Sequence, residues 1–90
     1  MLACGQREIA LLDTRLNSVY RGLLAALPPR ERNQLRGEQR RWLARHVAET
    51  RRLAADPNNG SAAFLDSQRF ELQNLGDRVR ILEAKAARRG

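Results

Sequence analysis

Two helix-breaking segments divide this chain of 90 residues into three pieces of similar length. At Pro28-Pro29, a preceding helix should end near Leu27, because the residue before a proline is disfavoured in helical conformation. Pro29 itself fits the first turn of the helix that follows. The second break, residues 56–61, combines Asp, Pro, Asn and Gly and ends at Ser61, which can cap another helix. Neither flanking piece nor the middle one contains a further proline, so each can be one continuous helix.

Each piece shows the 3-4 spacing of apolar residues that is typical of a helix with one buried face. The stripes are Ile9, Leu12, Leu16, Val19 and Leu23 in the first piece, and Leu65, Leu72, Leu75, Val79 and Leu82 in the third. No segment alternates as a strand would. We therefore predict a single all-α domain over 1–90, with long helices at about 3–27, 29–55 and 61–86. Short turns favour a three-helix antiparallel, up-down-up bundle. The narrow stripes would also suit coiled-coil pairing, which leaves a dimer as an alternative.

The corresponding line of the middle piece mixes apolar and polar residues: Leu35, Gln39, Trp42, His46, Glu49 and Leu53. Burying a polar group without a partner costs about 1–3 kcal/mol. We therefore expect partners for the polar members among Asn17, Tyr20 and Arg78. One interpretation is a buried polar network that sets the helix register. The other is a polar patch left open at a binding surface. In either case Trp42 should be buried near the centre of the bundle.

The positive charge of the chain is concentrated in the middle piece. The net charge is +7, and residues 28–54 contribute +5 of it, with eight arginines against three glutamates. Arg41, Arg45 and Arg52 share one side of the predicted helix and form a candidate anion-binding face. Such a face would suit nucleic acid, anionic lipid or an acidic protein. The alternative is structural, with arginine stems covering the rim of the core while their charged ends remain in water.

The residue types needed for catalysis are scarce. With one His and one Cys the chain lacks the ligand set of a metal site, and its six glycines are scattered rather than gathered in a phosphate-binding loop. His46 has no Ser, Cys or Asp three or four residues away, although Glu49 lies at i+3. Four aromatic residues are too few for a base-stacking platform. We predict a binding protein rather than an enzyme, with no cofactor. No transmembrane segment is expected, and Met1–Gly5 is too short for a signal peptide.

Two motifs connect the chain to a known family. Leu16-Asn17-x-x-Tyr20 is followed by Leu35-x-x-x-Gln39-Arg40-x-Trp42-Leu43, and the Gln-Arg-x-Trp portion is fairly specific. Gly60-Ser61 and Arg78-x-x-x-Leu82 come later in the expected order. The chain thus resembles the LprI-like N-terminal domain family of small exported bacterial helical domains, whose named member is a lysozyme inhibitor lipoprotein. The resemblance spans nearly the whole chain.

The resemblance implies a periplasmic or secreted binding module whose protein partner is a lysozyme or another envelope protein. The binding of polyanions by the middle helix remains the alternative. Common lysozymes are strongly basic, so an inhibitor with a charge of +7 needs a local acidic element. Its candidates are Asp56, Asp66, Glu71 and Asp77.

The chain departs from the family at the cysteines. The family has one shortly after the tryptophan, near Glu49-Thr50 here, and another near the position of Phe70. Cys4 resembles the cysteine that opens the family's first helix, and its partner would lie upstream of Met1. The resemblance therefore implies a disulfide-poor or truncated member, stabilised by packing rather than by disulfides.

Overall fold

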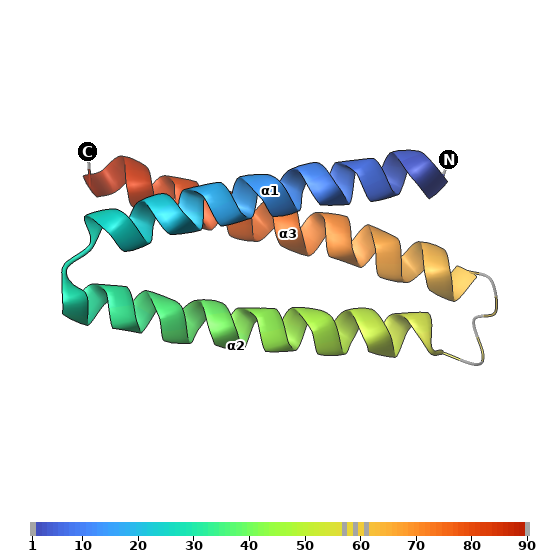
Figure 1. The fold of residues 1–90 in the computed structure, drawn as a ribbon. Coiled ribbons are helices and arrows are strands. Elements are labelled where there is room, and N and C mark those ends of the chain that lie inside the picture. Colours follow the sequence, from blue (N-terminus) through green and yellow to red (C-terminus); the bar gives the residue numbers. More distant parts are fainter. Residues whose placement is uncertain (1, 57, 59, 61, 90) are drawn as a thin grey trace.

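The computed structural model consists of three long helices joined by two short turns (Figure 1). It describes residues 2–56, 58, 60 and 62–89, and of residues 2–5 and 89 only the backbone. The helices are α1 (Leu2–Ala26), α2 (Pro29–Ala54) and α3 (Ala62–Arg89). No strand occurs in the described residues. The direction of the chain alternates from each helix to the next, which confirms the all-α, up-down-up prediction.

The first turn forms as the two prolines predict. Pro28 is extended, with φ −61° and ψ 159°, and Pro29 opens α2. The end of α1 has carbonyl groups without helical partners. Arg32 in the first turns of α2 supplies hydrogen-bond donors to two carbonyls in this region. Its Nε donates to the Leu24 carbonyl at 2.9 Å and its Nη2 to the Leu27 carbonyl at 3.1 Å. One guanidinium therefore ties α2 to the end of α1.

The second turn also uses local chemistry. The side chain of Asp56 accepts a hydrogen bond from the backbone N–H of Asn58 at 3.0 Å, a common turn-forming contact. Gly60 adopts φ +55°, which glycine tolerates better than any residue with a Cβ atom. The predicted cap, Ser61, lies outside the described residues.

The core is one continuous cluster along the bundle axis. Its buried members are Leu16, Leu23, Leu27, Leu35, Trp42, Leu75, Val79 and Leu82, with Ile9, Leu12 and Val19 packed against it. The predicted stripe of α1 therefore faces inward, as do Leu35, Trp42 and His46 of α2. Glu49 of the predicted α2 line is not buried and pairs with Arg52 of its own helix. Trp42 is 8% exposed, which confirms its predicted burial.

The prediction for α3 is wrong in its first two turns. Leu65 was assigned to the buried stripe, but it is 53% exposed, and Leu72 is only half-buried. The inward positions are instead Ala63, Ser67, Phe70 and Asn74, whose 4-3-4 spacing joins the predicted stripe at Leu75. Ser67 can be buried because its hydroxyl donates to the Phe64 carbonyl at 2.8 Å. Apart from Phe70, the inward face of this part of α3 is thus small or polar.

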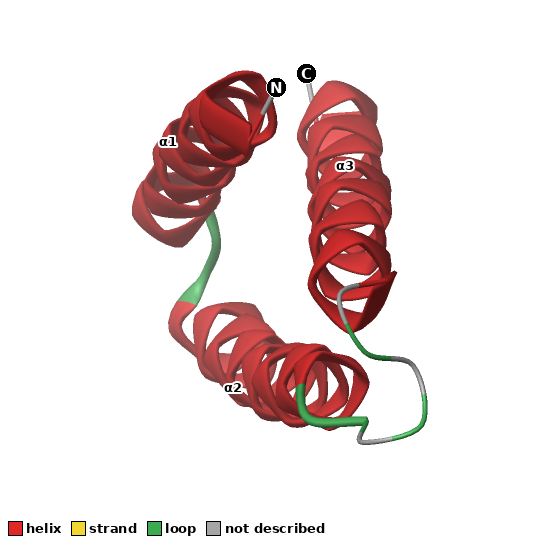
Figure 2. Ribbon diagram, turned by 90° about the vertical axis from the view of Figure 1, so that its right-hand side faces the viewer, coloured by secondary structure: helices red, strands yellow, loops and turns green. Residues whose placement is uncertain are grey.

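The three helices do not pack equally against one another. α3 contacts both α1 and α2 along its length, whereas α1 and α2 contact each other over only a short stretch. The end-on view in Figure 2 shows α3 beside α1, with α2 completing an open triangle. The molecule is therefore elongated, at 47 × 23 × 15 Å, and one of its three helix pairs is left open.

Candidate binding groove

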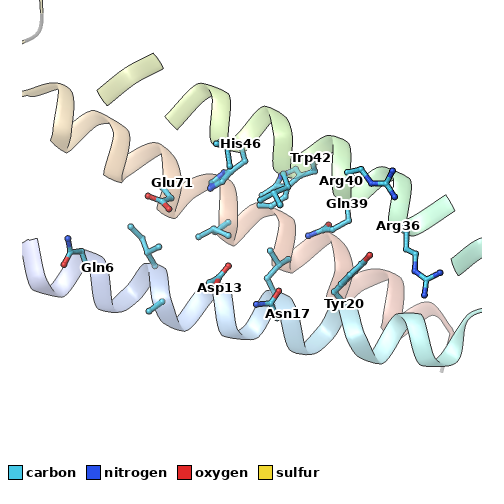
Figure 3. A pocket seen from close by; sticks show the side chains of 16 residues that line it. Gln6, Asp13, Asn17, Tyr20, Arg36, Gln39, Arg40, Trp42, His46 and Glu71 are labelled. Carbon is cyan, nitrogen blue, oxygen red and sulfur yellow. The ribbon is translucent and has the colours of Figure 1, made fainter. Parts of the chain in front are cut away.

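The open face between α1 and α2 is a groove of about 750 Å³ (Figure 3). Its walls are one face of α1 from Gln6 to Tyr20 and one face of α2 from Arg36 to Val47, and Glu71 and Leu75 of α3 form its floor. Among the lining residues, Ile9, Ala10, Leu16, Tyr20, Trp42, Leu43, Val47 and Leu75 supply apolar or aromatic surface. Mostly apolar clefts with a few polar groups are typical ligand sites.

Because α1 and α2 are antiparallel, the lining residues of one helix lie opposite those of the other across the groove. In Figure 3, Asp13 lies across from His46, Asn17 from Trp42, and Tyr20 from Gln39. Asn17 is exposed and Tyr20 is half-buried, so both present polar atoms at the α1 wall. The polar side chains of α1 keep this wall from forming a second hydrophobic seam.

The α2 wall is built around a stack of aromatic rings. The rings of Trp42 and His46 stack at 4.8 Å between centroids, and Phe70 stacks on the other side of His46 at 5.8 Å. The Asn74 amide donates to His46 Nδ1 at 2.8 Å, which places the proton of a neutral imidazole on Nε2. Trp42 and His46 are therefore held rigidly before any partner arrives.

Burial sets the charge state of His46. The side chain is only 6% exposed, and this burial lowers its pKa, although the nearby carboxylates of Glu71 and Asp13 act in the opposite direction. His46 is consequently neutral near pH 7. The partner of His46 is thus Asn74 of α3, which is not among the predicted candidates Asn17, Tyr20 and Arg78.

Arg78 supports the groove from beneath. Its Nε donates to Gln39 Oε1 at 2.8 Å, which confirms one predicted pairing, and its guanidinium lies 5.9 Å from the Trp42 ring centroid. Burial is the main cause of the lowered pKa of Arg78, and Arg45 contributes in the same direction. Arg78 Nη2 is buried without a hydrogen-bond partner among the described residues. Gln39 is thus positioned by an arginine whose hydrogen-bonding capacity is only partly satisfied.

The groove carries opposite charges at its two ends. Arg36 and Arg40 lie toward the end formed by the Pro28-Pro29 turn, and Asp13 and Glu71 lie at the His46 end (Figure 3). Arg36 Nη1 donates a hydrogen bond to Asn33 Oδ1 at 3.4 Å. Within the described part of the chain, none of these four charged residues forms an ion pair with another residue. Their charges are therefore available to a ligand.

The predicted polar residues lie together at one site in the structure, whereas the three arginines of the predicted anion-binding face do not. Asn17, Tyr20, Gln39, Arg40, Trp42 and His46 all line the groove, with Arg78 below them. Arg41, Arg45 and Arg52 are exposed on other parts of α2. Arg45 and Arg52 border a shallower hollow against α3, which Arg41 does not reach, and Arg52 is engaged by Glu49.

Two residues in contact with the groove or with His46 are not singled out by the sequence pattern. Asn74 lies off the predicted stripe through Leu72, on a second line of α3 that repeats every three or four residues: Ala63, Ser67, Phe70 and Asn74. Asp13 was not among the acidic candidates, because it lies on a different helix from Glu71. Of those candidates only Glu71 reaches the groove, while Asp77 pairs with Arg80 and Asp56 stabilises the second turn.

The described residues contain no group of three His, Cys, Asp or Glu side chains able to hold a metal ion. Nor does any of their helices have both the length and the apolar content that crossing a lipid bilayer requires. The side chain of Cys4 lies outside the described residues, as do the predictions made for it.

A family model described as lysozyme inhibitor LprI matches residues 1–82 of the chain. The chain belongs to this family. Neither a curated protein nor a solved structure matches it significantly. Among the residues that carried the resemblance in sequence, those that line the groove are Leu16, Asn17, Tyr20, Gln39, Arg40, Trp42 and Leu43. Leu35 and Leu82 are instead buried in the core, and Arg78 lies beneath the groove. The LprI family is one of inhibitors rather than enzymes, so the match points to protein binding.

Proposed function

We propose that this LprI-family chain is a non-catalytic, exported binding module, and that its protein partner docks in the groove between α1 and α2. A lysozyme is the first partner to test, and another envelope protein is the broader alternative. The family match supports protein binding and export. Catalysis and a cofactor are not part of the proposal.

One observation carries the proposal. Most of the motif residues on α1 and α2 line one groove of about 750 Å³, although they come from two helices. Motif residues kept for packing alone would be expected in the core, as Leu16, Leu35 and Leu82 are. Asn17, Arg40 and Leu43 are exposed instead. Exposed motif residues on opposite walls of one groove are better explained by a ligand.

The charge distribution also suits a basic partner. The chain as a whole is positive, and a basic lysozyme would be repelled by most of its surface. Asp13 and Glu71 supply an acidic element inside the groove, close to buried His46. A basic side chain of the partner could pair with these carboxylates while apolar atoms fill the groove beside Trp42. The rest of the positive surface would then restrict the approach to this one orientation.

The experiment is calorimetric titration with lysozyme at physiological salt, together with an assay of cell-wall lysis. We expect binding with inhibition for the natural chain. Leu43→Glu places a charge on an exposed apolar residue of the groove wall and should weaken binding at least tenfold. Ile81→Glu is the matched control, because Ile81 is equally exposed, at 54%, but lies outside the groove.

Two results would contradict the proposal. Equal losses in both variants would show that the groove is not the contact surface. Absence of binding to lysozymes of several classes would reject lysozyme as partner, and the groove would then be tested against envelope extracts with the same pair of variants.

A second candidate function is the binding of polyanions by α2. It is favoured by the exposure of Arg41 and Arg45 on that helix, but Arg52 is already engaged by Glu49. This function predicts affinity for duplex DNA or anionic vesicles that falls steeply between 50 and 200 mM salt, on the order of the losses seen when several phosphates are contacted. The joint change of Arg41, Arg45 and Arg52 to Ala should abolish it. Unchanged affinity in that variant would exclude this face.

A further inference from the structure

We propose that the groove receives an amphipathic helix of the partner, with basic residues toward Asp13 and Glu71 and acidic residues toward Arg36 and Arg40. The proposal rests on the groove being the binding site of the proposed function. It adds the conformation of the docking segment, its polarity and its length.

A helix fits the groove better than an extended segment. Both walls are helices, whose backbone N–H and C=O groups are already paired within α1 and α2. An extended segment would find no strand edge to hydrogen-bond with, and its backbone would lose water without compensation. A helix satisfies its own backbone and offers only side chains. Seated between α1 and α2, over α3, it would complete a four-helix arrangement.

The dimensions of the groove set the length of the segment. On α1 the lining runs from Gln6 to Tyr20, which corresponds to about 21 Å at a rise of 1.5 Å per residue. A helix of roughly 14 residues has the same length. Its apolar stripe would contact Ala10 and Leu43, both exposed at present, and Val47. Leu43 is 51% exposed, so a docked helix would cover apolar surface that water now contacts.

The charged residues at the two ends of the groove determine which charges the docking segment carries at each of its ends. Along α2, ten residues separate Arg36 from His46, which faces Asp13 and Glu71, so the two charged ends lie about 15 Å apart. That distance equals two to three turns of a helix. A partner helix with opposite charges at that spacing pairs at both ends. One with the same charge at both ends meets repulsion at one of them.

The test uses three helix-stapled peptides of 14 residues with the same apolar stripe. The dipolar peptide has Glu in its first turn and Lys in its last, and the other two have Lys or Glu at both ends. Trp42 is the chain's single tryptophan and lines the groove, so its fluorescence reports occupancy. We expect the dipolar peptide to bind roughly tenfold more tightly than either of the others, equivalent to 1.4 kcal/mol.

Charge reversal on the protein side sharpens the test. Arg36→Glu with Arg40→Glu should shift the preference to the Lys-ended peptide, and Asp13→Lys with Glu71→Lys to the Glu-ended one. The matched control is Arg41→Glu with Arg51→Glu, which makes the same change in net charge at exposed sites of α2 outside the groove. It should preserve the dipolar preference. Circular dichroism establishes that every variant is folded.

Each result decides between the alternatives. Equal affinities for the three peptides, or an equal effect of the control variant, would overturn the charge assignment. No binding of any peptide would overturn the helical occupant, even if lysozyme binds. Dissociation of a self-associated form by Leu43→Glu would identify a second copy as the occupant and overturn the proposal. Dipolar preference without lysozyme binding would reject the lysozyme proposal and leave this inference standing.

Discussion

The two sides of α1 are built differently. The side toward α3 is a closed hydrophobic seam, where Leu16 and Leu23 are no more than 3% exposed. The side toward α2 presents Ala10, Asp13 and Asn17, which are small or polar and all exposed. Two helices close on each other when both offer apolar ridges. Because α1 offers α2 mainly Ala10 and polar side chains on this side, the α1–α2 face stays open. The closed core seam and the candidate groove therefore lie on different sides of one helix.

The largest expected effect comes from removing the residue that belongs to both the core and the groove. Trp42→Ala deletes a ring in contact with the core and stacked on His46, and should cost roughly 3–5 kcal/mol of unfolding free energy. Leu43→Ala, at the half-exposed neighbouring residue, should lower the free energy of unfolding by less than about 1 kcal/mol. Urea denaturation followed by circular dichroism measures both. Similar losses of unfolding free energy in the two variants would contradict the assignment of Trp42 to the core and of Leu43 to the groove wall alone.

A smaller effect is expected where α3 supports the groove floor. Gln39→Leu removes the acceptor of Arg78 Nε, whose Nη2 is already unpaired, and should cost about 1–3 kcal/mol. Adding Arg78→Met removes the buried charge itself, so the double variant should recover most of that loss. Additive losses in this double-mutant cycle would show that the contact is not energetically coupled.

The next effect depends on pH. Burial lowers the pKa of His46 in the folded state below 6.5, the ordinary pKa of a histidine. As the pH falls through 6.5, His46 therefore takes up a proton in the unfolded chain before it does so in the folded one. The stability that neutral His46 contributes is complete above pH 6.5 and is lost as the pH falls toward the lowered folded-state pKa. His46→Gln should therefore lose less stability than the natural chain between pH 7 and 5. Parallel pH profiles of the two proteins would contradict the burial of a neutral imidazole.

The sequence predicted the parts of the fold that follow from local rules. Pro28-Pro29 and the Gly60 turn divide the helices as expected, and the periodic stripe of α1 and part of the α2 line face the core. The error in α3 has a physical reason. Leu65 is apolar but faces solvent, whereas Ser67 is polar but satisfies its hydroxyl within its own helix. Hydropathy alone ranks these two residues in the wrong order.

The site was harder to predict than the fold. The line of α2 singled out Gln39, Trp42 and His46, and all three line the groove. The sequence did not indicate that α1 would leave that line partly uncovered, because an open face depends on which sides of two helices meet. The acidic end of the groove was missed for the same reason. Asp13 and Glu71 come together only through the packing of α1 beside α3.

The smallest effect on stability should accompany a large effect on binding. Ala10→Phe places a ring in the groove from its α1 wall, where the natural side chain is small and exposed. Ala44→Phe makes the same change at an exposed site of α2 that lies outside the groove. Both variants lose the same helix propensity, about 0.5 kcal/mol, so their melting temperatures should nearly coincide. Only Ala10→Phe should displace a partner from the groove, with at least a tenfold loss of affinity. Equal binding by both variants would mean that the partner does not enter between α1 and α2, and a large loss of stability in Ala10→Phe alone would mean that the two helices close in solution.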